Sequence, residues 1–383
     1  MKKYLINSKI VVSVFFYFGM LTIVYAQNIY NSSASVNIPA GIVVSAGSLS
    51  NTSGTISNAG TLILVGSLTN TIAGTITFEN GSSLVQTAGT TNSNTGNIVY
   101  KRDTSIMRNN FDFTYWGSPV AGQTLAGIWM AVNNNNTFYS WTSPTSTWTP
   151  RFSNHVMAPA LGYIARSRNG TSGTDYANVT TSYFTSTPWQ ARFFGVPNNG
   201  DYTVNVNGVF PFTDNLLSNP YPSAIDIIAF RNDVSNIAQL SGNFYFWTHN
   251  NNISSNSYNA SDYAIFNVVL NASTGTASGA TPAPDRFVDA GQGFFAEGTA
   301  DGTVTFRNSH RVAGNNNAFY RVNSNTTTQE LSESHKIWFN LTNDQGLFKQ
   351  QLLTYTAGAT MGFDPTMDAK TYDGNEYIDF YSS

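Results

Sequence analysis

Hydrophobic positions in this chain occur in short runs rich in Val, Ile, Thr, Tyr and Phe, and polar clusters of Gly, Asn, Ser and Pro separate them. Runs of this length and composition are typical of β-strands, and the polar clusters are typical of turns. The pattern predicts an all-β protein. In the central part of the chain the expected strands are Asp112–Trp116, Thr137–Trp141, Gly162–Arg166, Asp201–Val206, Asn243–Thr248, Tyr263–Val269, Gly293–Ala296 and Thr303–Arg307.

One stretch departs from this pattern. The segment Ser223–Phe230 places Ile225, Ile228 and Ala229 on one side of a helix, and Ser223 stands where an N-cap residue is needed. We therefore expect one short helix here, capped by Ser223.

Residues 27–100 contain an internal repeat. Gly47–Thr52 (GSLSNT) returns as Gly66–Thr71 (GSLTNT) nineteen residues later, and a weaker third copy begins at Gly81–Val85. A repeat of about 20 residues with regularly placed Leu, Ile and Val predicts a β-solenoid, in which each coil buries its inward side chains against the next coil. Asn and Thr are expected to form ladders at the corners. The alternative is a low-complexity linker.

The remainder of the chain is expected to divide into three parts. Residues 101–325 carry the aromatic residues and predict a β-rich, sandwich-like domain, and residues 326–335 form a polar linker. Residues 336–383 predict an incomplete C-terminal β-domain, because three strands are few for an independent sandwich. These strands are Lys336–Leu341, Phe348–Tyr355 and Tyr377–Tyr381.

Residues 1–26 have the pattern of a signal peptide. Lys2 and Lys3 precede the apolar run Ile10–Val24, and small residues precede the expected cleavage site after Ala26. The apolar run is shorter than the ~20 residues that a membrane-spanning helix needs, and no later stretch reaches that length. An uncleaved anchor is the alternative. The sequence predicts a secreted or surface-held protein with no transmembrane segment after cleavage.

Composition removes several classes of function. The chain has no cysteine, which excludes disulfides, thiolate catalysis and Cys-ligated zinc. Charged residues make up 10% of the chain and the net charge is −3, so there is no electrostatic case for nucleic acid or for an anionic membrane surface.

Candidate chemistry is sparse. The four histidines lie far apart, and no GxSxG motif is present. Paired carboxylates could serve a hydrolase of polysaccharides, and the acidic residues beside expected strands are Asp112, Asp201, Asp226, Asp262 and Glu297. Calcium is the better ionic candidate, because oxygen ligands are dense in one C-terminal loop. The possible Ca²⁺ ligands are Asp364, Asp368, Asp373, Asn375 and Glu376, and a solvated acidic turn is the alternative.

Aromatic residues make up 14% of the chain and suggest carbohydrate binding, since flat rings stack on sugar faces. Trp141 and Trp148 lie in the turn-rich segment SWTSPTSTWTP, where we expect exposure, and they are the predicted carbohydrate-binding residues. Trp247 and Trp338 lie in alternating strands and are expected in the core. Asn219–Pro222 is expected to be a structural corner.

Several segments in order along the chain resemble a family of large secreted proteins of Bacteroidetes that usually carry a C-terminal type IX sorting domain. They are Phe113–Val120, Leu217–Asp226, Asn243–His249, Ala290–Phe295, Val304–Val312, Ile337–Phe348 and Thr371–Ser382. The resemblance implies type IX export machinery as a partner and an adhesin-like role at the cell surface, and it supplies no catalytic residues. No sorting domain follows Thr371–Ser382, which differs from the family pattern.

Together these observations predict a secreted or cell-surface binding protein, structural or adhesin-like, without catalysis. Its expected partners are polysaccharide or cell-surface glycans. The alternatives are a polysaccharide-acting hydrolase and a truncated remnant of a longer type IX-secreted protein.

Overall fold

The computed structural model describes residues 27–71, 75–104, 112–129, 138–166, 190–208, 213–248, 262–276, 283–316, 335–344, 348–371 and 380. Over these residues the protein is all-β, as predicted, with one short α-helix. Within the same ranges no helix has the length and apolar composition that crossing a membrane requires. The predicted signal peptide, residues 1–26, lies outside the described part of the chain.

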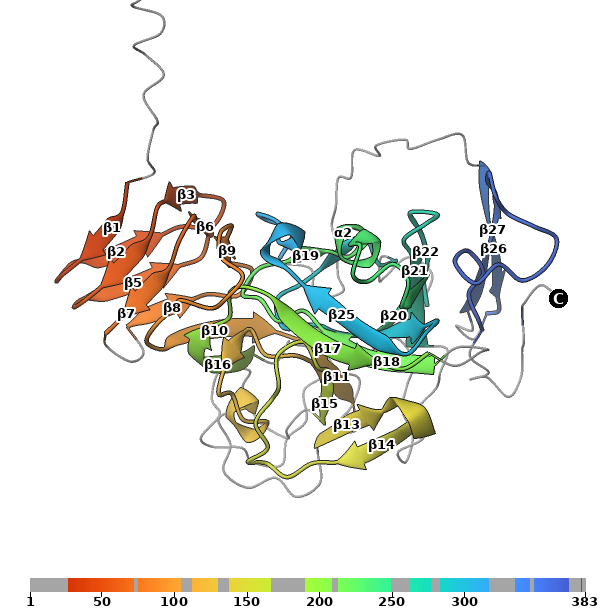
Figure 1. Ribbon diagram of the computed structural model, residues 1–383, viewed down its shortest axis with the longest axis horizontal. Coiled ribbons are helices and arrows are strands. Elements are labelled where there is room, and N and C mark those ends of the chain that lie inside the picture. Colours follow the sequence, from red (N-terminus) through yellow and green to blue (C-terminus); the bar gives the residue numbers. More distant parts are fainter. Residues whose placement is uncertain are drawn as a thin grey trace, which may run out of the picture.

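The N-terminal part is a β-solenoid, as predicted, with three coils of three short strands each (Figure 1). Equivalent strands stack in parallel into three sheets, β1-β4-β7, β2-β5-β8 and β3-β6-β9. In chain order the strands are β1 (Ile29–Asn31), β2 (Ser35–Ile38), β3 (Val43–Ala46), β4 (Leu49–Asn51), β5 (Thr55–Asn58), β6 (Thr61–Leu64), β7 (Leu68–Asn70), β8 (Ile76–Phe78) and β9 (Ser83–Gln86).

Strand pairing confirms the repeat and corrects its third copy. Leu49 pairs with Leu68, as the two GSL motifs predict. The third copy expected at Gly81–Val85 is wrong, because Leu84 pairs with Leu62 on a different face of the solenoid. Which of the three sheets a strand joins depends on the number of residues between successive turns of the coil, so a similar sequence motif can recur in a different sheet.

One solenoid sheet continues into the central part of the molecule. β10 (Ile98–Asp103) pairs in parallel with β8 and antiparallel with β16 (Gln190–Pro197), which also pairs with β12 (Val120–Ala121). The six-stranded sheet therefore runs β2-β5-β8-β10-β16-β12. The predicted boundary at residue 100 falls inside β10.

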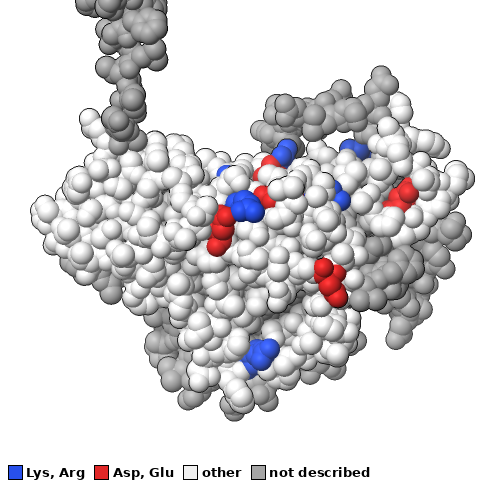
Figure 2. All heavy atoms as spheres, in the orientation of Figure 1, with Lys and Arg blue, Asp and Glu red and all other residues white. Residues whose placement is uncertain are grey.

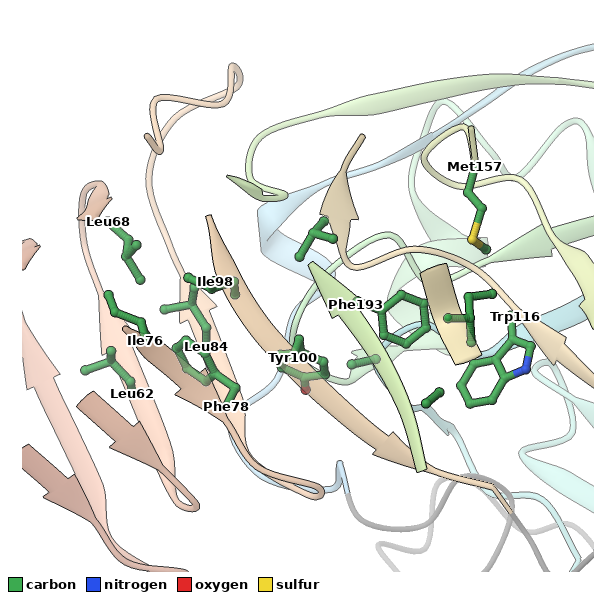
Figure 3. Packing of buried hydrophobic residues seen from close by; sticks show 14 of the residues in the cluster. Leu62, Leu68, Ile76, Phe78, Leu84, Ile98, Tyr100, Trp116, Met157 and Phe193 are labelled. Carbon is green, nitrogen blue, oxygen red and sulfur yellow. The ribbon is translucent and has the colours of Figure 1, made fainter. Parts of the chain in front are cut away.

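The hydrophobic core follows the same continuity. Figure 3 shows Leu62 and Ile76 inside the coils, followed by Tyr100, Phe193 and Trp116 toward the central part. All five side chains are at most 1% exposed. The open end of the solenoid is therefore closed by side chains of the central part, which spares its apolar interior from water.

The central part contains two larger antiparallel sheets that face each other across a layer of aromatic residues, so it is sandwich-like. All the strands predicted for this part are present. The four-stranded sheet is β11 (Phe113–Trp116), β15 (Tyr163–Arg166), β13 (Phe138–Thr142) and β14 (Thr147–Pro150). The five-stranded sheet is β18 (Thr213–Ser218), β24 (Gly293–Gly298), β20 (Leu240–Trp247), β21 (Tyr263–Asn267) and β22 (Ala272–Thr274). The central part also contains two two-stranded sheets, β17 (Tyr202–Val206) with β25 (Gly302–Phe306) and β19 (Ile225–Asp226) with β23 (Phe287–Val288).

The predicted helix is present but begins later than expected. α2 spans Ile227–Asn232, and its N-cap is Asp226, whose carboxylate accepts from the amides of Ile228 and Ala229. The expectation of Ser223 as the cap is wrong, because the preceding residues pair as β19. The Ser223 hydroxyl accepts instead from the Nε of Arg311.

The predicted C-terminal pair of strands is confirmed as an antiparallel hairpin of β26 (His335–Thr342) and β27 (Phe348–Tyr355). The third expected strand, Tyr377–Tyr381, lies outside the described residues except for residue 380. The expectation of a buried Trp338 is wrong, since its side chain is 45% exposed and its Nε1 donates to the carbonyl of Ser273 at 2.9 Å. A two-stranded hairpin cannot cover both of its own faces.

Candidate functional site

The two predicted carbohydrate-binding tryptophans lie side by side on neighbouring strands. Trp141 of β13 and Trp148 of β14 are register partners, and their ring centroids are 4.9 Å apart with an interplanar angle of 68°. A tight 3-10 turn, η2 (Ser143–Thr145), joins the strands, and Ser146 follows it with φ 49°. The segment is thus a hairpin and not an open loop, and both rings are half-buried.

An aromatic cluster between the two large sheets holds this pair in place. We define the aromatic cluster as Phe113, Tyr115, Ile164, Leu216, Tyr245 and Phe295, together with Tyr139, Trp141, Trp148, Trp247, Tyr263 and Ile265 packed against them. The ring centroid of Phe295 is 5.1 Å from that of Trp141 and 5.9 Å from that of Trp148, and both contacts are edge-to-face. The Nε1 of Trp141 donates to the carbonyl of Asp214 at 2.8 Å. Edge-to-face packing of this kind fixes ring orientation.

The position of Trp247 agrees with the core expectation. Its ring stacks on Tyr115 at 5.9 Å with an interplanar angle of 8°, and it meets Tyr263 edge-to-face at 5.0 Å. The Tyr115 and Tyr263 hydroxyls share a hydrogen bond. Burial raises the pKa of Tyr263, so this phenol stays neutral and available as a hydrogen-bonding group.

Two carboxylates lie opposite each other beside the aromatic cluster. Asp214 of β18 and Glu297 of β24 are register partners, and Lys370 approaches both, with its Nζ 2.6 Å from Asp214 Oδ1 and 3.9 Å from Glu297 Oε1. Residues directly opposite in an antiparallel sheet point to the same face. Sequence reasoning included Glu297 among the acidic candidates but missed Asp214 and Lys370, which no spacing along the chain connects.

Glu297 is almost completely buried, at 1% exposure. Its Oε2 accepts from Ser241 Oγ at 2.9 Å and from Asn243 Nδ2 at 3.0 Å, and its Oε1 accepts from the Tyr245 hydroxyl at 2.5 Å. Burial raises the pKa of the Glu297 carboxyl, and these hydrogen bonds and the Lys370 charge offset the increase only in part. The carboxyl can therefore hold a proton more readily than an exposed glutamate.

Lys370 reaches this position because the segment before it is hydrogen-bonded to the five-stranded sheet. Asn243 Nδ2 donates to the Asp368 carbonyl at 2.7 Å, and Asn267 Nδ2 donates to the Thr366 carbonyl at 3.0 Å. A Cβ at Gly242 would lie 1.9 Å from that Thr366 oxygen, so only glycine permits the approach. Two side-chain amides and one glycine thus position the lysine.

The possible calcium loop is described only at its beginning. Asp364 accepts from the Thr360 amide at 2.6 Å and from the Thr360 hydroxyl at 3.0 Å, while Asp368 accepts from the Asp364 amide at 2.7 Å. Asp373, Asn375 and Glu376 lie outside the described residues. Among the residues that are described, no group of three or more acidic or histidine side chains is arranged to hold a metal ion. Calcium binding by this loop stays a prediction.

The remaining acidic candidates do not converge on Glu297. Asp201 pairs with Arg307, and Asp226 caps α2 and pairs with Arg286. Asp112 and Asp262 are buried just before β11 and β21. Of the described carboxylates named by the sequence, only Glu297 belongs to the polar group beside the aromatic cluster.

The corner Asn219–Pro222 has a structural position, as expected. All four residues are buried. Asn219 Nδ2 donates to the carbonyls of Ser223, Val288 and Asp289, and the Pro222 carbonyl accepts from the solenoid amide of Leu84 at 2.7 Å.

These features define an all-β protein in which a solenoid and a sandwich-like part share one core. The chain belongs to the family described as a domain of unknown function (DUF8693), whose model matches residues 23–383. Comparison with curated proteins and with solved structures gave no match. The family match spans the solenoid, the central part and the C-terminal hairpin together.

Proposed function

We propose that this protein is a secreted or cell-surface binding protein, structural or adhesin-like, that contacts polysaccharide or cell-surface glycans and does not convert them. The observation that carries the proposal is the Trp141–Trp148 pair. It lies on an edge hairpin, remains partly exposed, and is held in one orientation by Phe295 and by the Asp214 carbonyl.

The chemistry of this edge suits a neutral ligand. Sugars present C–H faces that pack against aromatic rings and hydroxyls that pair with neutral polar groups. Because the two rings meet at 68°, a sugar would contact the face of one ring and the edge of the other. Figure 2 shows few and scattered charged side chains on the viewed face, which offers little attraction for an ionic polymer. Export by a type IX route and calcium binding belong to the same proposal.

A glycan array probed with the full chain tests this function. We expect binding to at least one neutral polysaccharide, and we expect Trp148→Ala to weaken it by about tenfold, the change that ~1.4 kcal/mol of lost contact energy produces. Trp148 is the better first variant because Trp141 also donates a hydrogen bond inside the fold. Trp338→Ala is the matched control, since Trp338 is an exposed tryptophan of the C-terminal hairpin, outside the aromatic cluster.

Equal binding by the wild type and the Trp148→Ala variant would contradict the proposal, as would the absence of binding to any glycan. A polysaccharide-acting hydrolase is the second candidate, favoured by the opposed Asp214 and Glu297 carboxylates. Its argument is weaker because Glu297 is buried and its oxygens are hydrogen-bonded within the fold. Shortened oligosaccharides recovered from the bound glycans would favour the hydrolase.

A further inference from the structure

We propose that Lys370 and Asp214 become joined by an intramolecular amide bond, formed by the folded chain itself with Glu297 as the proton-transfer group. The proposal is independent of glycan binding. It assigns a covalent modification to the polar group beside the aromatic cluster.

The first argument is the geometry of the reacting atoms. Lys370 Nζ lies 2.6 Å from Asp214 Oδ1, so the amine nitrogen is next to the carboxyl carbon that it would attack. The two residues are 156 positions apart, yet β18 fixes Asp214 and the bonded segment Thr366–Asp368 fixes the approach of Lys370. Holding two reactants in this way converts a bimolecular condensation into an intramolecular one, which lowers the barrier.

The second argument is the carboxyl of Glu297 beside the reacting pair. Glu297 Oε1 is 3.9 Å from Lys370 Nζ, and Glu297 is the strand partner of Asp214. Ser241, Asn243 and Tyr245 hold its side chain in one position. Burial raises its pKa, so it can carry a proton to Asp214 and accept one from the amine.

The third argument is the surroundings. Leu216 and Phe295 of the aromatic cluster lie on β18 and β24, the strands of Asp214 and Glu297. Tyr245 lies on the neighbouring β20, and Lys370 Nζ is 5.8 Å from the centre of its ring. The Lys370 and Asp214 side chains are 31% and 16% exposed, so the two charges are partly removed from water, which has a cost. An amide in their place is neutral and does not carry this cost.

The reaction balances without any co-reactant. The ion pair first becomes a neutral amine and a neutral carboxylic acid, because one ammonium proton moves to Asp214 through Glu297. The Nζ lone pair then forms the C–N bond to the Asp214 carboxyl carbon, and one C–O bond of that carboxyl breaks. The departing oxygen leaves as water with the proton it received and a second proton from the nitrogen, again relayed by Glu297. Glu297 is regenerated, one positive and one negative charge disappear, and one water is released.

Mass spectrometry of the full chain tests the proposal. Trypsin cleaves after Lys370 only when its Nζ is a free amine, so the cross-linked protein should yield a branched peptide containing both Asp214 and Lys370. Its mass should equal that of residues 193–231 plus that of residues 350–383, the latter uncleaved after Lys370, minus one water. We expect this peptide in the wild type, and we expect its loss in Glu297→Gln and in Lys370→Arg, which keeps the positive charge.

The Lys101–Glu79 pair is an internal control. Its Nζ–carboxylate distance is 2.8 Å, but among the described residues Lys101 forms an ion pair with Glu79 alone, whereas Lys370 also has Glu297 beside it, so we expect no branched peptide there. Linear peptides alone at Asp214 and Lys370 in the wild type would overturn the proposal, and this result does not depend on how any variant folds. A branched peptide that persists in Glu297→Gln would overturn the role of Glu297.

Discussion

At the scale of single residues, His310 shows how the fold keeps a titratable group neutral. Its side chain is 3% exposed. Its Nδ1 accepts from the Arg307 amide at 3.1 Å, so its proton is on Nε2, which lies 3.2 Å from Asp233 Oδ2. Burial lowers the pKa of His310 below its ordinary 6.5, and Asp233 offsets this only in part. Burial raises the pKa of Asp233, but hydrogen bonds from Ser235 and His310 and the Arg307 charge outweigh it and hold this pKa at about 2.

This arrangement predicts a loss of stability in mild acid. Below pH 6.5 the unfolded chain binds a proton at His310 more readily than the folded chain does, so the free energy of unfolding falls as the pH decreases. The Asp233 contribution is lost in a separate window, between pH 3.8 and about 2. We expect His310→Gln to reduce the difference in urea stability between about pH 7.5 and about pH 5.

His335→Gln is the control, because His335 is exposed on β26. A pH dependence that is unchanged in His310→Gln would contradict this account of the buried imidazole.

At the scale of elements, an asparagine ladder runs inside the solenoid. Asn31 Nδ2 donates to Asn51 Oδ1 at 3.0 Å, Asn51 Nδ2 donates to Asn70 Oδ1 at 2.9 Å, and Asn70 Nδ2 donates to the Asn97 carbonyl at 2.6 Å. The first three side chains are at most 3% exposed. Each amide satisfies its neighbour where the chain turns, which is the condition for burying polar groups.

We expect Asn51→Ala to lower the free energy of unfolding by about 1–3 kcal/mol, because it removes the buried hydrogen bonds that Asn51 makes with Asn31 and Asn70. Chemical denaturation monitored by circular dichroism measures this loss. Asn37→Ala is the matched control, since Asn37 is exposed in β2 and its replacement should change stability by less than about 0.5 kcal/mol. Equal effects of the two substitutions would be incompatible with a stabilising ladder.

The strands that sequence reasoning found are runs rich in Val, Ile, Thr, Tyr and Phe. Of the strands that it missed, β18 and β16 illustrate two reasons. β18 contains Asp214 and Asn215, polar residues that strands generally avoid, and Asn215 is buried here through hydrogen bonds to the backbone of Asn207 and Thr213. β16 contains Gly195 and Pro197, residues that usually interrupt or end a β-strand.

The candidate site was predictable only where it is local. Trp141 and Trp148 are close in sequence, and their hairpin places them side by side. The group formed by Asp214, Glu297 and Lys370 was not predictable, because it depends on strand pairing and on a segment 156 residues away. The exposure of Trp338 was not predictable either, because it depends on which elements cover the hairpin and not on the alternation of apolar and polar residues within its strands.

At the scale of the whole molecule, buried polar residues join the solenoid to the central part. Arg311 is 7% exposed and donates to the Leu84 carbonyl of β9, to Asn199 Oδ1 at 3.0 Å and to Ser223 Oγ at 3.1 Å. Asn308 Nδ2 donates to the carbonyls of residues 88 and 89 at 3.1 and 3.0 Å. Hydrogen bonds from a charged donor are stronger than neutral ones, so this contact supports the shared core.

The shared core predicts that the solenoid does not fold alone. A fragment of residues 27–103 would expose Ile98 and Tyr100 of β10 at its open end, because β16 with Phe193, and Trp116 beyond it, would be absent (Figure 3). Three coils are near the minimum for a stable repeat array. We expect this fragment to show no cooperative thermal transition by circular dichroism, whereas residues 27–316 should melt in a single transition. A sharp transition in the shorter fragment would refute the dependence.

The sheet that passes from parallel to antiparallel pairing at β10 has one more consequence. Because β10 pairs with strands of both parts, the backbone hydrogen bonds of one sheet hold the solenoid and the sandwich-like region in a fixed relative orientation. The tryptophan hairpin is therefore already oriented relative to the solenoid before a ligand binds.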